Sequence, residues 1–321
     1  MDERTRDDEQ TRDQDVSLRE RLASGGFAVT AEISPPRGAS IDKITQTAAQ
    51  LKDWVDAVNV TDNQGSNVRL ASWAGSLAVQ SAGLDPVMQM TCRDRNRIAL
   101  QSDLLGASAL GIRNILVMTG DHPKFGDHPE AKPVFDLDSV QLLWTLRTMR
   151  DQHVLLSGRK LNPAPDCFLG AVENPFAPPV EFRADRLGKK VAAGAQFVQT
   201  QFVFDVPAFA RWMAQVRDLG LTEHCAILAG VGAVRSIKAL DYMQSHVPGV
   251  EVPDHIFQRL RKVPPAQQTA EGIKLAAEIV QQVAQIPGVA GVHLLVAGNE
   301  QAVPAILDRA ELNLTRGTDG R

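Results

Sequence analysis

The chain of 321 residues is 44% hydrophobic and 22% charged, with a formal net charge of −4; this excludes a disordered protein and suits one large α/β barrel or two ordinary domains. It contains neither a run of about 18 apolar residues nor a signal-peptide pattern, so we expect no membrane span and a cytoplasmic protein. The near balance of charge also argues against the basic face that nucleic-acid binding requires, and favours a small-molecule partner.

The chain begins with a strongly charged segment. Residues 1–16 contain seven acids and three arginines, so their net charge equals that of the whole chain. We expect a disordered acidic tail over residues 1–16, a folded catalytic domain over residues 17–315 and a flexible end over residues 316–321.

From Phe27 onward, short β-branched runs alternate with amphipathic stretches, which is typical of βαβ units around a parallel sheet. Eight strands with helical crossovers indicate a single (β/α)8 TIM barrel rather than an open doubly wound sheet, and no G-x-G-x-x-G motif follows the first strand. The predicted strands are Phe27–Ser34, Ala57–Asp62, Val87–Cys92, Asn114–Asp121, Cys167–Val172, Phe197–Asp205, Cys225–Val231 and Ala290–Val296.

Helices are predicted between these strands from apolar periodicity and capping residues. One helix starts near Asp138–Ser139, and another follows the N-cap Asp205 with a proline at its first position. The other predicted helical segments are Ile41–Val55, Arg183–Ala193, Pro253–Leu260 and Ala266–Ala284.

The segment from Thr119 to Asp138 is too long and polar for a simple connector, so we expect it to lie over a ligand. Its histidines, His122 and His128, lack the spacing of a metal site. The three cysteines are widely spaced within apolar stretches, which indicates buried, reduced thiols. They are Cys92, Cys167 and Cys225.

Catalytic groups of a barrel gather at the carboxyl ends of its strands, and two acids stand at such ends. Glu32 ends the first strand, where a semi-buried carboxyl can act as a general acid; a structural ion pair is the alternative. Asp121 closes the fourth strand after Gly120, where a turn aspartate is the alternative. Gln199 and Gln201 leave the sixth strand with amides of the kind that read a heterocycle edge.

Several segments resemble, in order from Phe27 to Leu312, the methylenetetrahydrofolate reductases: AEISPPRG, VNVTDNQ, MTCRDRN, ILVMTGDHP, KKVAAGAQFVQTQFVFD and GVHLL. The amino-acid sequence of these motifs is closer to that of the short acetogen-type members than to that of the standard bacterial enzyme. The resemblance implies a flavin, FAD with FMN open, that passes hydride to 5,10-methylenetetrahydrofolate and yields 5-methyltetrahydrofolate. It also implies NAD(P)H or a partner redox subunit as the electron source, and leaves a homo-oligomer open.

Carried over by position, the resemblance makes Glu32 the acid that opens the imidazolidine ring and Asp121 the charge that stabilises the iminium. Gln201 matches the glutamine that orients folate. Lys190, a surface lysine when interpreted from its helix alone, would face the flavin phosphate. The implied flavin contacts are Thr61, Gln89, Thr119, Gly120, Asp121, Phe135, Asp136, Ala171, Lys190 and Gln199.

The chain departs from the family pattern at several positions. Gln89 stands where histidine is usual, and Thr119 where arginine is usual. The last strand runs Leu294-Leu295-Val296-Ala297-Gly298-Asn299 in place of a ligand-binding tyrosine and arginine, so the contacts of the folate tail and the electron donor stay unassigned. Two alternative functions remain: a folate-binding methyl-transfer barrel, and a flavin-binding accessory subunit without hydride chemistry.

Overall fold

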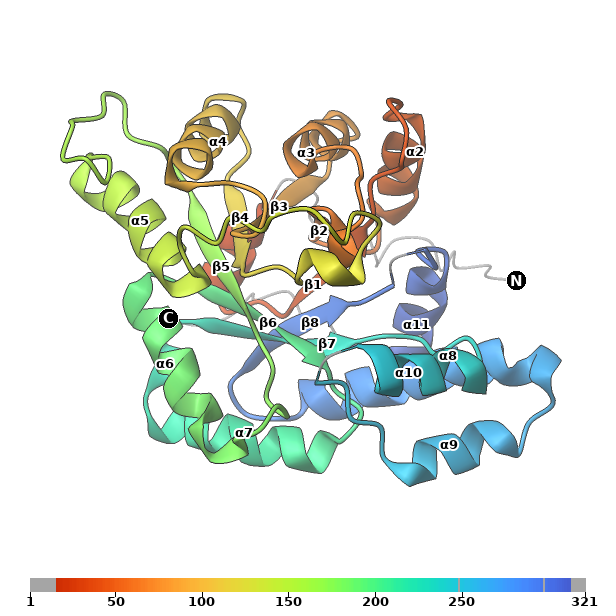
Figure 1. Ribbon diagram of the computed structural model, residues 1–321. Helices are drawn as coiled ribbons and strands as arrows, with labels where there is room; N and C mark the ends of the chain where they lie inside the picture. The colour runs from red at the N-terminus through yellow and green to blue at the C-terminus, as the bar shows by residue number, and fades with distance from the viewer. Residues whose placement is uncertain (1–15, 248, 297, 313–321) are drawn as a thin grey trace, which may run out of the picture.

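The computed structural model describes residues 16–247, 249–296 and 298–312, and in it eight parallel strands close into a barrel (Figure 1). The predicted (β/α)8 fold is confirmed, and every predicted strand overlaps an observed one. The predicted acidic tail, apart from Val16, and the predicted flexible end lie outside the described residues. The strands are β1 (Ala28–Ile33), β2 (Ala57–Val60), β3 (Asp85–Thr91), β4 (Asn114–Met118), β5 (Phe168–Glu173), β6 (Phe197–Phe202), β7 (Ala226–Val231) and β8 (Val289–Leu294).

Helices surround the strands as an outer ring (Figure 1). Short 3-10 turns join them, including η1 (Gln64–Ser66), η2 (Pro123–Phe125) and η3 (Val180–Phe182). The helices are α1 (Leu18–Ala23), α2 (Asp42–Leu51), α3 (Ser72–Ser81), α4 (Arg97–Ala109), α5 (Ser139–Gln152), α6 (Arg183–Ala193), α7 (Val206–Asp218), α8 (Ile237–His246), α9 (Asp254–Arg261), α10 (Gln268–Ala284) and α11 (Ala302–Ala310).

Capping residues fix several helix starts as predicted. The Asp138 side chain accepts from the Gln141 backbone N–H, and the Gln141 side chain accepts in return from Asp138 N, which completes a capping box for α5. Asp205 caps α7 by accepting from Ala208 N, without a reciprocal bond. The proline of this helix is at its second position and not its first, because the helix begins at Val206.

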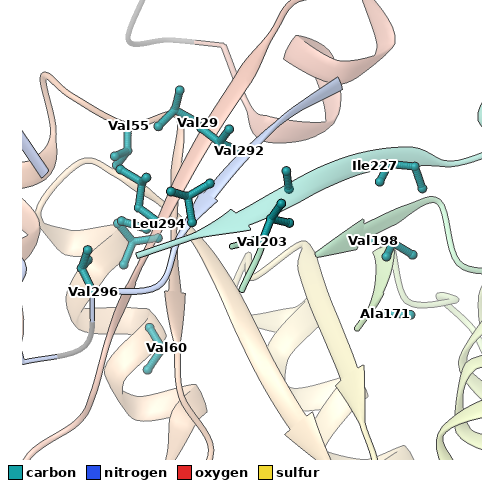
Figure 2. Close-up of a cluster of buried hydrophobic side chains, with 14 of the residues drawn as sticks. Val29, Val55, Val60, Ala171, Val198, Val203, Ile227, Val292, Leu294 and Val296 are labelled. Carbon is teal, nitrogen blue, oxygen red and sulfur yellow. The ribbon is translucent and has the colours of Figure 1, made fainter. Parts of the chain in front are cut away.

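Strand side chains alternate between the helix layer and the barrel interior. Val29, Val198 and Ile227 belong to the large cluster that packs the strands against the helices (Figure 2). The interior is filled near the strand starts by a second cluster, which Leu18 of α1 joins: Leu18, Ala28, Ala57, Val87, Leu116, Phe168, Phe197 and Leu228. Helix α1 therefore closes the end of the barrel opposite to the strand exits.

The three cysteines are buried and free, as predicted. Burial raises the pKa of each thiol to about 12. Across residues 16–247, 249–296 and 298–312, no helix is both long enough and apolar enough to cross a membrane. The same residues contain no group of three or more His, Cys, Asp or Glu side chains that could hold a metal ion.

Candidate active site

Glu32 is the penultimate residue of β1, next to the open end of the barrel. Its side chain is buried, with 6% of the residue exposed. It shares the inward face of β1 with Thr30, because residues two apart on a strand point to the same side. The structure therefore places this acid inside the barrel mouth, as the sequence predicts.

A polar layer lies in the barrel at the level of Thr30. The amides of Asn59 and Gln199 bond each other in both directions, at 2.6 and 3.1 Å, and Gln199 Nε2 also donates to Thr30 Oγ1 at 3.2 Å. Thr30 Oγ1 lies 2.9 Å from His293 Nδ1. Desolvation lowers the pKa of His293 to about 3, so the imidazole is neutral. Gln199, predicted to contact flavin, is thus occupied within this layer.

The pairing of β6 with β7 shifts between Gln199 and Phe202, which makes an irregularity next to Gln201. Thr200 Oγ1 accepts the Gly230 N–H at 2.9 Å and so replaces a ladder bond that the shift removes. Gln201 Oε1 accepts from Phe202 N at 3.0 Å, which leaves its amide N–H groups available to a ligand. Irregularities of this kind re-aim side chains near active sites, and this one turns Gln201 at the strand exit.

Asp121 is exposed and follows Gly120, whose φ of 89° is in the left-handed region that favours glycine. Its backbone carbonyl accepts from Arg93 Nη1 at 3.3 Å. Arg93 also pairs with Asp94 at 2.6 Å and is 2% exposed. Burial lowers the pKa of the Arg93 guanidinium, but the carboxylates of Asp94, Asp62 and Asp121 together outweigh burial and raise it.

Arg93 thus joins the exits of three strands, because it also donates to the Asn63 carbonyl after β2. Sequence reasoning placed this residue at a strand exit but gave it no role, although the buried β3 run followed directly by alternating charges was a signal for one. The long segment after β4 is fixed to the same exits. Asp127 accepts from Val68 N, and Val134 N donates to the Arg93 carbonyl, so the segment lies across the ends of β2 and β3 (Figure 1).

Three predicted flavin contacts come together on this side of the mouth. Thr61 and Gln89 are buried at 1% and 7% exposure, on neighbouring strand exits, and Gly120 follows the next strand. The Gln89 amide makes no side-chain hydrogen bond to another residue that the structure describes, so it is available to a ligand. Thr119 is exposed and donates to Ser139 Oγ at 3.2 Å.

Other predicted flavin contacts lie apart from this group. Ala171 points outward into the cluster under the helices, so only its backbone could touch a ligand at the mouth (Figure 2). Phe135 is at the surface. The neighbouring Asp136 accepts three hydrogen bonds from Arg97, two from the guanidinium at 2.8 and 2.9 Å and one from the backbone N–H at 2.9 Å. These bonds lower the pKa of Asp136 to about 2.

Lys190 is buried, so its interpretation as a surface lysine is wrong. Its ammonium group donates to Glu173 Oε2 at 2.7 Å and to the Val172 carbonyl at 2.5 Å. Arg183 and Arg186 each lie 3.9 Å from the other oxygen of the Glu173 carboxylate. Because Glu173 already neutralises the lysine, a flavin phosphate would have to displace this ion pair.

A cavity of about 510 Å³ opens between the exits of β6, β7 and β8 and the start of α8. Phe202, Leu295 and Val296 form apolar parts of its wall, and Arg235 and Lys238 are its charged residues. Sequence reasoning did not assign any of these residues, because they come from three separate parts of the chain.

Comparison with known proteins gives one consistent result. A family model described as methylenetetrahydrofolate reductase matches residues 17–311. A probable methylenetetrahydrofolate reductase (NADPH) of Caenorhabditis elegans is 24% identical over 86% of this chain, which spans 41% of the relative. The 5,10-methylenetetrahydrofolate reductase of Pectobacterium carotovorum is 25% identical over 74% of this chain and 75% of its own. Methylenetetrahydrofolate reductase 2 of Saccharomyces cerevisiae is 23% identical over 85% of this chain, which spans 46% of that relative.

Solved structures show the same fold. A protein from Clostridium thermocellum, described as binding two copies of 5-methyl-5,6,7,8-tetrahydrofolic acid, superposes with a TM-score of 0.64 at 13% identity. The match covers 92% of this chain and 98% of that one.

Proposed function

The chain belongs to the methylenetetrahydrofolate reductase family, and from that premise we propose that it reduces 5,10-methylenetetrahydrofolate to 5-methyltetrahydrofolate with a flavin as the hydride source. The observation that carries the proposal is one buried acid and one exposed acid at the same end of the barrel. Glu32 is 6% exposed and Asp121 is open to solvent. In parallel-stranded barrels this end is where catalysis takes place.

We assign Glu32 to proton transfer. Reduction at the methylene carbon requires the imidazolidine ring to open, with a proton delivered to N10 and an iminium formed at N5. A carboxyl inside the barrel mouth can be positioned against N10 of a bound folate, which is what a general acid needs. The inward position of Glu32 on β1 therefore suits the acid role better than the exposed position of Asp121 does.

We assign Asp121 to charge stabilisation and Gln201 to orientation of the pterin. A carboxylate close to the iminium lowers the barrier to its formation, because the two charges are opposite. Because Gln201 Oε1 is held by Phe202 N, its amide nitrogen is the group left to donate to a pterin acceptor.

The residues at the barrel mouth suit a flavin ring. Lys190, which is paired with Glu173, is not arranged to bind a flavin phosphate. Thr61, Gln89 and the backbone at Gly120 would hold the ring, which supplies the hydride when bound. The unbonded Gln89 amide is the group that suits a heterocycle edge. The phosphate of the cofactor would need partners other than the lysine paired with Glu173. We propose FAD, with NAD(P)H or a redox partner as the electron source.

The test begins with the purified protein. Absorbance and chromatography of the released cofactor establish whether flavin is present and distinguish FAD from FMN. The protein is then incubated anaerobically with methylenetetrahydrofolate and either NADH, NADPH or a chemical reductant, and 5-methyltetrahydrofolate is measured. Product in any arm supports the proposal. A colourless protein that binds folate without product indicates the methyl-transfer barrel, and bound flavin without product indicates the accessory subunit.

A further inference from the structure

The polar layer of Thr30, Asn59, Gln199 and His293 lies where a barrel of this kind is usually filled by branched apolar side chains. All four residues are buried, with at most 3% of each exposed. Buried amides and hydroxyls weaken a fold unless each is hydrogen-bonded, and apolar side chains of the same size would pack here without that requirement. Stability alone therefore does not account for the layer, and its place in the barrel points to a role in the site above it.

The layer lies directly beneath Glu32. Thr30 precedes Glu32 by two residues, so both side chains point into the barrel from β1. On the neighbouring strand β2, Asn59 is the register partner of Glu32. Register partners on parallel strands point to the same side of the sheet, so the Asn59 amide and the Glu32 carboxyl start from adjacent positions inside the barrel.

The hydrogen bonds of the layer run in one direction. Gln199 Nε2 donates to Asn59 Oδ1 at 3.1 Å and to Thr30 Oγ1 at 3.2 Å, which uses both of its hydrogens. The nearer acceptor for the Thr30 hydroxyl proton is His293 Nδ1 at 2.9 Å, against 3.5 Å for the Val292 carbonyl. The imidazole can accept this proton because burial keeps it neutral, with a pKa of about 3. His293 thereby fixes which end of the Gln199 amide faces Thr30.

The orientation of Gln199 decides that of Asn59. Gln199 Oε1 accepts from Asn59 Nδ2 at 2.6 Å, so the two amides pair in both directions. Turning the Asn59 amide over would set two N–H groups and two oxygens against each other, which is costly in a buried pair. Asn59 Nδ2 carries two hydrogens, and the pairing with Gln199 uses one of them. The second hydrogen is therefore held in a fixed direction, one strand away from Glu32.

We propose that Asn59 is a positioning residue for Glu32, and that its second N–H orients the carboxyl towards N10 of the bound folate. This inference rests on the proposed function. An N–H given to the carbonyl oxygen of the protonated carboxyl leaves its O–H to face the ligand. Gln199, Thr30 and His293 act through Asn59, because they keep its amide from turning. The layer thus holds the acid within hydrogen-bond reach of the atom that takes its proton.

The test is a double-mutant cycle on the single-turnover rate of the chemically reduced protein with methylenetetrahydrofolate. Asn59→Leu, which is similar in size, should lower the limiting rate by about 10- to 100-fold and leave KM unchanged, because a displaced acid reacts slowly once the substrate is bound. In a Glu32→Gln background the same change should alter the rate by at most about twofold, because the group that Asn59 positions is gone.

Thr30 supplies a second cycle, which carries the same comparison should the Asn59→Leu protein not fold. Thr30→Val removes the hydroxyl that joins Gln199 to His293 and should slow the reaction in the Glu32 protein only. Thr30→Ser keeps the hydroxyl and should restore the wild-type rate. The control for packing damage is Val87→Ala, a fully buried residue of the apolar cluster below the layer, which should change the rate equally in both backgrounds. Equal effects of Asn59→Leu or of Thr30→Val in both backgrounds would overturn the inference.

Nuclear magnetic resonance of protein with isotope-labelled asparagine separates this inference from the proposed function, since it requires no turnover. Glu32→Gln should move the signal of the second Asn59 Nδ2 hydrogen more than that of the hydrogen bonded to Gln199, whereas Glu181→Gln should move neither. Signals that stay in place in the Glu32→Gln protein overturn the inference and leave the reductase proposal intact. Wild-type turnover by Glu32→Gln refutes instead the acid assignment on which the inference rests.

Discussion

Replacing Glu173 with glutamine would leave the Lys190 ammonium group buried without its carboxylate. The two side chains are 1% and 5% exposed and lie 2.7 Å apart, so neither is solvated. Removal of one partner from a buried ion pair costs about 3–5 kcal/mol of unfolding free energy, because the remaining charge stays desolvated. Arg183 and Arg186 nearby would add to the uncompensated positive charge.

The pH dependence of this variant follows from Lys190. Burial lowers the pKa of the lysine, and Glu173 opposes that shift, so the pKa falls further when the carboxylate is lost. Between the folded pKa and the unfolded value of about 10.4, the unfolded state binds more protons, so the free energy of unfolding rises with pH. The Glu173→Gln variant should therefore recover part of its loss between pH 7 and alkaline pH.

Denaturant unfolding followed by circular dichroism, at neutral and alkaline pH, measures both effects. The matched control is Asp166→Asn, which breaks exposed ion pairs with Arg19 and Arg113; the three side chains are 57%, 49% and 46% exposed, in that order. That change should cost at most about 1 kcal/mol and show no recovery at high pH. A Glu173→Gln cost as small as that of the control, or a loss that does not shrink with pH, would refute the reasoning.

Three further outcomes are expected. Gly230→Ala should lower the free energy of unfolding by about 1–3 kcal/mol through overpacking, since the new methyl group would lie 2.8 Å from the Gln201 carbonyl. Gly106→Ala, the control, has open space around it and should not destabilise the protein; thermal unfolding compares the two variants. His293 has a folded pKa of about 3, below the unfolded value of about 6.5, so it contributes stability that is lost as the pH falls between these values. His293→Gln should therefore make the free energy of unfolding depend less on pH between about pH 6.5 and pH 4. At pH 8 a thiol reagent should label no cysteine in the folded protein and all three after unfolding, and rapid labelling of the native state would contradict their burial. These are Cys92, Cys167 and Cys225.

Local chemistry made the fold predictable from the sequence. Alternation of β-branched runs with amphipathic stretches located all eight strands. The cap at Asp138 located the start of α5, because capping depends only on residues three apart. The inward position of Glu32 followed from its place at the end of an apolar strand, and the structure agrees.

The burial of Lys190 could be predicted in part from the sequence. Its helix buries Ala184, Leu187 and Lys190, which are spaced three apart, so this spacing was a signal for the packed face that the interpretation as a surface lysine overlooked. The ion pair of Lys190 with Glu173 could not be predicted, because it joins a strand exit to the helix that follows. Strand alternation likewise predicts the outward position of Ala171, since Phe168 and Val172 share the opposite, inward face.

The cavity was not predictable from the sequence. Its walls combine residues that follow β6, β7 and β8, and the register of a closed barrel decides which of them meet. The role of Arg93 is similar, because its partners at Asn63 and Asp121 lie about thirty residues away on either side.

The most direct test of the central claim is single-turnover reduction of methylenetetrahydrofolate by the chemically reduced protein, with 5-methyltetrahydrofolate measured over time. Wild type and Glu181→Gln, an exposed acid at the same end of the barrel, should react at the same rate. Glu32→Gln should be slower by about 10²–10⁴, the usual contribution of a general acid. Asp121→Asn should also slow the reaction, through loss of charge at the iminium. Wild-type rates in both the Glu32→Gln and Asp121→Asn proteins would contradict the account.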